Sequence, residues 1–111
     1  MSKFFDINDV LIAKANIFNN IIHTPIIQSS FFTNYFDFNL FLKLELFQRT
    51  GSFKVRGVLN KLSKLSNEEK SNGVISLSAG NHAQALAWAS TKNDINSTII
   101  MPYNASKSKV K

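Results

Sequence analysis

The chain has 111 residues, 44% of them hydrophobic and 18% charged, which is typical of a folded protein and excludes a fully disordered one. The absence of cysteine excludes disulfides and thiolate chemistry, and the two separated histidines give no reason to expect a metal site within these residues. The net charge of +6 is scattered apart from three lysines near the C-terminal end, so we expect no nucleic-acid partner. The sequence has neither a signal-peptide pattern nor an apolar run long enough to span a bilayer, so we expect a cytoplasmic protein with no membrane partner.

The first part of the chain predicts two helices separated by an extended segment. Asp6 is suited to cap a helix over residues 7–22, where apolar side chains recur at three- and four-residue spacing. Pro25 then begins a short extended segment, and Ser29 and Ser30 are suited to cap a second short helix.

The phenylalanines are concentrated in this same part of the chain. All ten lie between Phe4 and Phe53, and they are numerous enough to supply a dense core there. The segment Leu40–Leu46 carries a leucine at every second position, which predicts a half-buried strand.

The second part of the chain follows a strand-helix-strand pattern. Ser66 and Glu69 predict a capping box for a short helix. Strands predicted at 74–77 and 98–101 flank a helix predicted at 82–92. Two strands joined by one helix and short loops are almost always parallel with a right-handed crossover. The expected fold class is therefore α/β.

The turn over residues 78–82, between a strand and a helix, is the first candidate site. The N-terminus of a helix presents backbone N–H groups and the positive end of its dipole to an anion. Gly80 allows the backbone to approach a ligand closely, and Ser78 and Asn81 add side-chain donors for a carboxylate or phosphate. An ordinary strand-helix turn capped by Asn81 fits the same residues.

Lys54 is the second candidate, at the start of a predicted helix beside Arg56 and between the apolar residues Phe53 and Val55. A lysine that is desolvated and close to another cation becomes a nucleophile able to form a Schiff base with a carbonyl cofactor. A surface lysine on the polar side of the helix fits the same spacing.

Taken together, the two segments resemble a known family. The stretch Lys43–Gly57, which reads KLELFQRTGSFKVRG, and the stretch Ser78–Gln84, which reads SAGNHAQ, are similar to fold-type II pyridoxal-phosphate enzymes. Within the tryptophan synthase beta-like superfamily, they resemble the branch that contains serine/threonine dehydratase (threonine ammonia-lyase) and serine racemase. The resemblance begins near His23 and implies an α/β chain with parallel-sheet, Rossmann-like βαβ elements.

The resemblance implies specific roles for residues of both segments. Lys54 would bind pyridoxal 5'-phosphate as a Schiff base and later remove the substrate Cα proton. Phe53 would pack beside the cofactor ring, and Asn81 would hydrogen-bond the ring oxygen. The residues that would bind the carboxylate of the amino-acid substrate are Ser78, Ala79, Gly80, Asn81 and His82. The implied reaction converts L-threonine or L-serine to 2-oxobutyrate or pyruvate, with release of ammonia.

Two positions help to choose within the family. Val55-Arg56-Gly57 follows the lysine, whereas the threonine-synthase and cysteine-synthase branches usually carry an Asp-Arg pair there. Ala79 stands where the racemase has a serine that acts as the second acid or base, and a methyl group cannot carry a proton. Elimination is therefore favoured over racemisation, while the choice between threonine and serine stays open.

The resemblance also suggests a regulatory ligand, because members of this branch bind a nucleotide at a subunit interface. The residues that match positions of that pocket for an adenine nucleotide are Ser29, Ser30, Phe31, Arg49, Thr50 and Gln84. A helix cap formed by the serine pair and a surface arginine explain the same residues. A complete member is also expected to be a homo-oligomer.

By the resemblance, residues 1–70 are an incomplete part of the larger domain and residues 71–111 are the start of the smaller one. The glycine-rich phosphate loop and a divalent-cation site would then lie downstream, and we expect the isolated 111 residues to be inactive. Three classes of interpretation stay open: the N-terminal part of an ammonia-lyase, a non-catalytic remnant that pairs with an intact homologue, and a basic binding module. Within the first class, racemase-like activity is the alternative to elimination.

Overall fold

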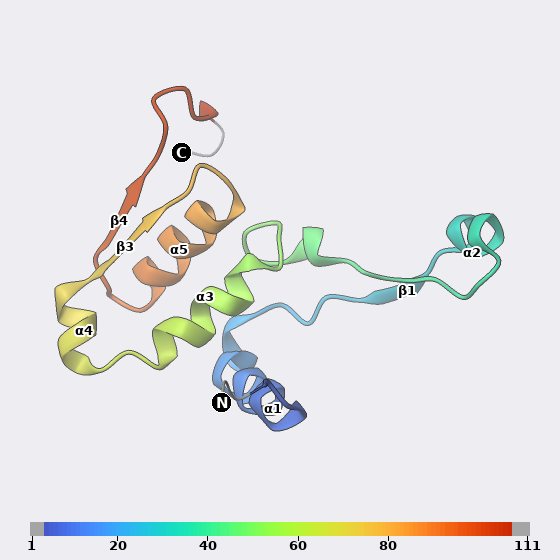
Figure 1. Ribbon diagram of the computed structural model, residues 1–111, viewed down its shortest axis with the longest axis horizontal. Coiled ribbons are helices and arrows are strands. Elements are labelled where there is room, and N and C mark those ends of the chain that lie inside the picture. Colours follow the sequence, from blue (N-terminus) through green and yellow to red (C-terminus); the bar gives the residue numbers. More distant parts are fainter. Residues whose placement is uncertain (1–3, 108–111) are drawn as a thin grey trace.

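The computed structural model describes residues 4–107, which form two separate two-stranded sheets, one on a projecting arm and the other beside the main group of helices (Figure 1). The α-helices are α1 (Ile7–Ile17), α2 (Ser30–Phe36), α3 (Lys54–Ser63), α4 (Asn67–Asn72) and α5 (Asn81–Lys92). The strands are β1 (Ile26–Gln28), β2 (Phe41–Lys43), β3 (Val74–Leu77) and β4 (Ser97–Ile100), and the 3-10 helices are η1 (Phe18–Asn20) and η2 (Glu45–Phe47). Within residues 4–107, no helix is long and apolar enough to cross a membrane.

Local side chains determine where three of the helices begin. The Asp6 carboxylate accepts hydrogen bonds from backbone N–H groups in the first turn of α1, and the Asp9 carboxylate accepts one from Asp6 N. Ser66 and Glu69 form the same reciprocal box at α4. The Ser29 hydroxyl accepts a bond from the first turn of α2. The caps predicted from the sequence are therefore confirmed, since each depends only on neighbours within three residues.

The two sheets differ in direction. Strands β1 and β2 are antiparallel, with Ile26 opposite Lys43. Strands β3 and β4 are parallel, with Val74 opposite Ser97, and α5 connects them. The parallel βαβ unit and the α/β fold class are confirmed.

The strand predicted over Leu40–Leu46 is shorter in the structure, where β2 spans Phe41–Lys43. Pairing ends at Lys43, and the chain turns into η2, where Phe47 N donates to Leu44 O at 3.1 Å. The turn follows from a tertiary contact, because Glu45 bonds to side chains outside its own strand pair. The alternation of leucines could not reveal that contact.

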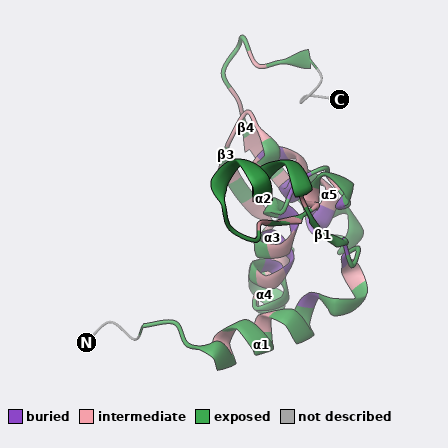
Figure 2. Ribbon diagram, turned by 90° about the vertical axis from the view of Figure 1, so that its right-hand side faces the viewer, coloured by how far each residue is buried: buried purple, intermediate pink, exposed green. Residues whose placement is uncertain are grey.

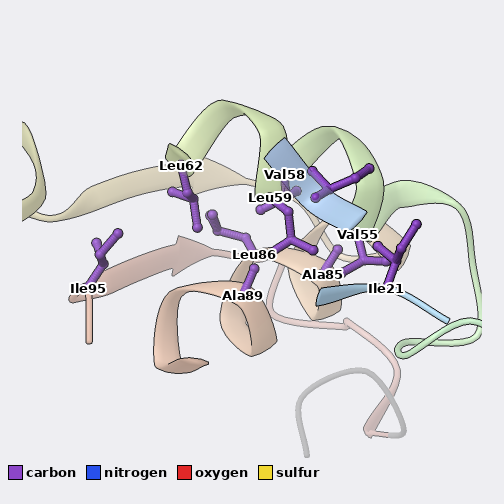
Figure 3. Packing of buried hydrophobic residues seen from close by; sticks show 10 residues of the cluster. Ile21, Val55, Val58, Leu59, Leu62, Ala85, Leu86, Ala89 and Ile95 are labelled. Carbon is purple, nitrogen blue, oxygen red and sulfur yellow. The ribbon is translucent and has the colours of Figure 1, made fainter. Parts of the chain in front are cut away.

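The core is aliphatic and is centred on one face of α3, which packs against α5 and α1. Figure 3 shows side chains of α3 and α5 directed toward one another. The buried cluster consists of Ile17, Ile21, Val55, Val58, Leu59, Leu62, Ala85, Leu86, Ala89 and Ile95. It draws on both sides of the expected boundary at residue 70, and the division into two domains stays a prediction.

The expectation of a phenylalanine core is wrong. All ten phenylalanines are exposed in the structure, from Phe32 at 38% to Phe5 at 92%. Five of them, Phe31, Phe32, Phe36, Phe38 and Phe41, lie on an arm formed by β1, α2 and β2 that projects away from α3 and α5 (Figure 1). Figure 2 shows α2 mainly in the colour of exposed residues, whereas α1 also has segments in the colours of buried and intermediate residues. Rings on the arm contact one another, as in the stacked pair of Phe31 and Tyr35, and none joins the aliphatic core.

Two glycines provide a matched test of the backbone. Gly73 has a φ of 80°, and a Cβ there would lie 2.7 Å from the backbone oxygen of Asn96, whereas a Cβ at Gly57 in α3 would meet nothing within 4 Å. We expect Gly73→Ala to lower the free energy of unfolding by about 1–3 kcal/mol. Gly57→Ala should leave it unchanged or raise it by up to about 1 kcal/mol. Urea denaturation of the purified variants measures both, and equal losses would contradict this description of the fold.

Candidate active site

A cavity of about 450 Å³ lies between α3, β3 and the first turns of α5. Its lining is mainly apolar, and its polar lining residues are Lys54, Lys61, Ser76 and His82. Phe53 also lines it. The fold therefore brings Lys54 and His82, one residue from each motif, to a single cavity. The order of the two motifs in the sequence could not have revealed this proximity.

Lys54 is the first residue of α3, and its side chain is exposed. Its Nζ lies 5.0 Å from the centroid of the Phe53 ring, and within residues 4–107 it makes no ion pair. The desolvated environment expected for Lys54 is absent from this part of the chain. Arg56, expected as its neighbouring cation, is instead paired with Glu45.

The Glu45–Arg56 pair is bidentate. Arg56 Nε donates to Glu45 Oε2 at 2.8 Å, and Arg56 Nη2 donates to Glu45 Oε1 at 2.7 Å. These hydrogen bonds are the main reason that the pKa of Glu45 falls to about 2, and a bond from Thr24 also lowers it, while burial acts in the opposite direction. The same pair raises the pKa of Arg56.

Gln48 makes a second set of bonds from the same region. Its side chain is almost fully buried, accepts from Ile22 N at 2.9 Å and donates to Ile22 O at 2.8 Å. Thr24 Oγ1 donates to Glu45. The side chains of Glu45 and Gln48 therefore both bond to residues 22–24, which follow η1. We call Thr24, Glu45, Gln48 and Arg56 the polar bracket, because together they join residues 22–24, η2 and the first turn of α3.

The 78–82 turn is built differently from an ordinary capped turn. Gly80 N donates to Ser78 Oγ at 3.2 Å, and α5 begins at Asn81 with Gly80 in the capping position. Asn81 therefore is not the helix cap, and no side chain caps the first turn of α5. Helix α3 also begins without a side-chain cap. The two uncapped α-helices among the described elements are thus the two that carry the sequence motifs.

His82 is held by a residue that the sequence analysis did not single out. Its Nε2 lies 3.1 Å from Ser76 Oγ on β3, and both residues line the cavity. The strand alternation provides a weak signal for this contact, since Ser76 shares a face with Val74. Ala79, like Ser78, is half-buried in the turn, and it does not line the cavity.

The residues matched to a nucleotide pocket are separated in this chain. Ser29 precedes α2, and Ser30 and Phe31 lie within it at the end of the arm (Figure 1). Arg49 and Thr50 follow η2, close to the start of α3, and Gln84 lies on α5. The structure does not bring the two groups together.

Comparison with known proteins places this site in a family. The model of the family described as pyridoxal-phosphate dependent enzyme matches residues 17–111, and the chain belongs to that family. It is 43% identical over 104 residues to the catabolic L-threonine dehydratase TdcB of Escherichia coli K12 and 42% identical over 102 residues to the L-threo-3-hydroxyaspartate ammonia-lyase of Saccharomyces cerevisiae. The structure is similar to a serine racemase from Dictyostelium discoideum, with a TM-score of 0.87 and 36% identity.

These similarities cover most of this chain and a smaller part of each relative. They include 94%, 92% and 93% of this chain but 32%, 31% and 34% of the E. coli, yeast and Dictyostelium proteins. The chain thus spans about a third of the length of the relatives that it matches. The resemblance to the dehydratase and racemase branch of fold-type II enzymes is confirmed.

The residues present fit the cofactor for which the family is named. Lys54 offers a primary amine at a largely apolar hollow, next to an aromatic ring. In the loop that leads to it, Thr50 Oγ1 and Ser52 Oγ are buried without a hydrogen-bond partner among the described residues. Neither hydroxyl lines the cavity, and Ser90 Oγ of α5 is buried without a partner among the described residues in the same way. Residues 4–107 hold no cluster of metal-ligating side chains, and the divalent cation stays a prediction.

Glu45 should make the stability of the protein dependent on acid pH. Its folded pKa of about 2 lies below the ordinary value of 4.5, so its stabilising effect is complete above about pH 4.5 and is lost as the pH falls toward 2. We expect the free energy of unfolding to change less between pH 5 and pH 2 in Glu45→Gln than in the wild type, by about 2 kcal/mol, as measured by urea denaturation. Glu68→Gln, which changes an exposed carboxylate of α4, should keep the wild-type slope. A wild-type slope in Glu45→Gln would contradict the assignment.

Proposed function

We propose that the protein containing this chain is a pyridoxal-phosphate-dependent ammonia-lyase that acts on L-threonine or L-serine. The observation that carries the proposal is that the Lys54 amine and the second motif, through His82, face one cavity. Two relatives at 42–43% identity, named as a threonine dehydratase and a hydroxyaspartate ammonia-lyase, support this reaction class. The products are 2-oxobutyrate or pyruvate, together with ammonia.

The residues have separate tasks in this proposal. When bound, pyridoxal phosphate supplies an electron-accepting ring that makes the Cα–H bond of an amino acid acidic. Lys54 binds the cofactor through Nζ and accepts the Cα proton at that atom. Phe53 packs beside the ring, and Asn81 bonds to its ring oxygen. The carboxylate of the substrate is bound by residues 78–82, which is consistent with a first turn of α5 that has no side-chain cap.

The remaining expectations are proposals that rest on the family. We propose that residues 1–70 belong to the larger domain and residues 71–111 to the smaller one, and that the complete protein is a cytoplasmic homo-oligomer. A nucleotide site that uses Ser29, Ser30 and Phe31 together with Arg49, Thr50 and Gln84 requires two subunits. One chain holds the first group on the arm and the second beside α3 and α5.

Loss of the Lys54 amine tests the mechanism. We expect Lys54→Ala to lower the rate of ammonia release from L-threonine and L-serine by about 100-fold to 10,000-fold, since it removes both the cofactor attachment and the base. Lys61→Ala is the matched control, because Lys61 lines the same cavity. It should stay within about threefold of wild type in the same coupled assay. Full activity in Lys54→Ala would overturn the proposed mechanism.

The similarity to a serine racemase makes racemisation the second candidate activity. Proton return from the opposite face needs a side chain that carries a proton, and the methyl group of Ala79 cannot do this. We expect the wild type to convert L-serine to pyruvate with little D-serine. Ala79→Ser should raise D-serine formation by about tenfold or more, and Ala79→Gly should not, as measured by chiral chromatography. If the wild type formed D-serine as fast as it formed pyruvate, the result would favour a racemase.

A further inference from the structure

We propose that Glu45 is a positioning residue for Lys54 and that it acts by holding Arg56 in the first turn of α3. This inference rests on the proposed function, since it assigns a role toward the amine that binds the cofactor. It assigns Glu45 no contact with substrate or cofactor. It concerns the polar bracket, of which Glu45, Gln48 and Arg56 lie within the Lys43–Gly57 stretch without a positioning role having been assigned to them.

The start of α3 is not fixed by a local cap. Asp6, Ser29 and Ser66 each accept a backbone N–H at the beginnings of α1, α2 and α4. Phe53, in the capping position of α3, offers no such bond. The residue at which α3 begins, and so the position of Lys54, must be determined by contacts from elsewhere in the fold.

The Glu45–Arg56 pair is the contact with the required geometry. Two parallel N–H···O bonds of 2.7 and 2.8 Å constrain both the distance and the orientation of the guanidinium. Arg56 stands two residues after Lys54 in the same helical turn. Both side chains are shielded, with Arg56 30% and Glu45 15% exposed, so solvent screens the pair only in part.

Glu45 is itself anchored to a buried frame. Thr24 is 4% exposed and donates from Oγ1 to Glu45 Oε1, while Lys43 Nζ donates to Thr24 O. Gln48, also 4% exposed, ties η2 to Ile22. The carboxylate therefore transmits the position of the segment that follows α1 to the first turn of α3.

Lys54 depends on this frame as well as on the core packing of Val55, because no local cap fixes the first turn of α3. Its side chain is exposed, and its Nζ lies 5.0 Å from the centroid of the Phe53 ring. A displacement of about 1 Å in a reacting group can lower a rate by about 100-fold. Releasing Arg56 from Glu45 should thus impair turnover more than substrate binding.

The test compares variants of the purified, cofactor-loaded protein. We expect Glu45→Gln to lower kcat about 10-fold to 100-fold with KM within about threefold, and Glu45→Asp to restore part of kcat. Glu69→Gln is the matched control, since it removes a carboxylate that holds the start of α4 through the same kind of box. It should keep kcat within about twofold of the wild type.

A second readout needs no cofactor. Amide hydrogen exchange of the cofactor-free protein should become faster over residues 48–58 in Glu45→Gln and stay unchanged there in Glu69→Gln. Unchanged kcat or unchanged exchange over 48–58 in Glu45→Gln would overturn the proposal. If Glu45→Gln does not fold, Arg56→Lys is the second variant, because it keeps the charge but loses the bidentate geometry. It should show a smaller loss of kcat and a smaller increase in exchange over residues 48–58, and wild-type values of both would overturn the proposal.

The two proposals fail in different ways. If Lys54→Ala keeps full activity, the proposed function fails, while the exchange measurement still decides whether Glu45 holds the start of α3. If Lys54→Ala is inactive and Glu45→Gln turns over like the wild type, the proposed function stands and the positioning role is wrong.

Discussion

The burial of one face of α3 is the constraint on which the rest of the structure depends. Val55, Leu59 and Leu62 are packed against α1 and α5, and this packing holds together segments that are far apart in the sequence. Because a helix repeats every 3.6 residues, Lys54 and Lys61 then lie on a flank of α3 next to its buried face, and they line the cavity beside β3 together with Val58 and Leu62. The position of the amine thus depends on core packing together with the polar bracket at the start of α3.

Features that depend on neighbouring residues were predictable from the sequence. The caps at Asp6, Ser29 and Ser66 and the parallel βαβ unit all follow from short-range chemistry. The phenylalanine core and the full strand over Leu40–Leu46 were wrong, because both depend on which distant surface a segment meets. An aromatic-rich segment can be a projecting arm as readily as a core, and local pattern does not distinguish them.

In the candidate site, too, the motifs were predictable from the sequence and the contacts that position them were not. Lys54 and the 78–82 turn were identified from motifs, and the fold brings both to the region between α3 and α5. The residues that position them, Glu45 and Ser76, bond to partners 11 and 6 residues away, and the motifs alone indicate neither contact. The bracket around Glu45 gives α3 a defined start without a local cap, which leaves the residues around Lys54 available to a ligand.

The central claim is that Lys54 is the residue that binds pyridoxal phosphate. Its most direct test is mass spectrometry of the protein purified from its source and reduced with borohydride, which fixes an imine-bound cofactor to its lysine. We expect a pyridoxyl-phosphate adduct on the peptide that contains Lys54. An adduct on another lysine, such as Lys61, or none on a protein purified with the cofactor present, would contradict it.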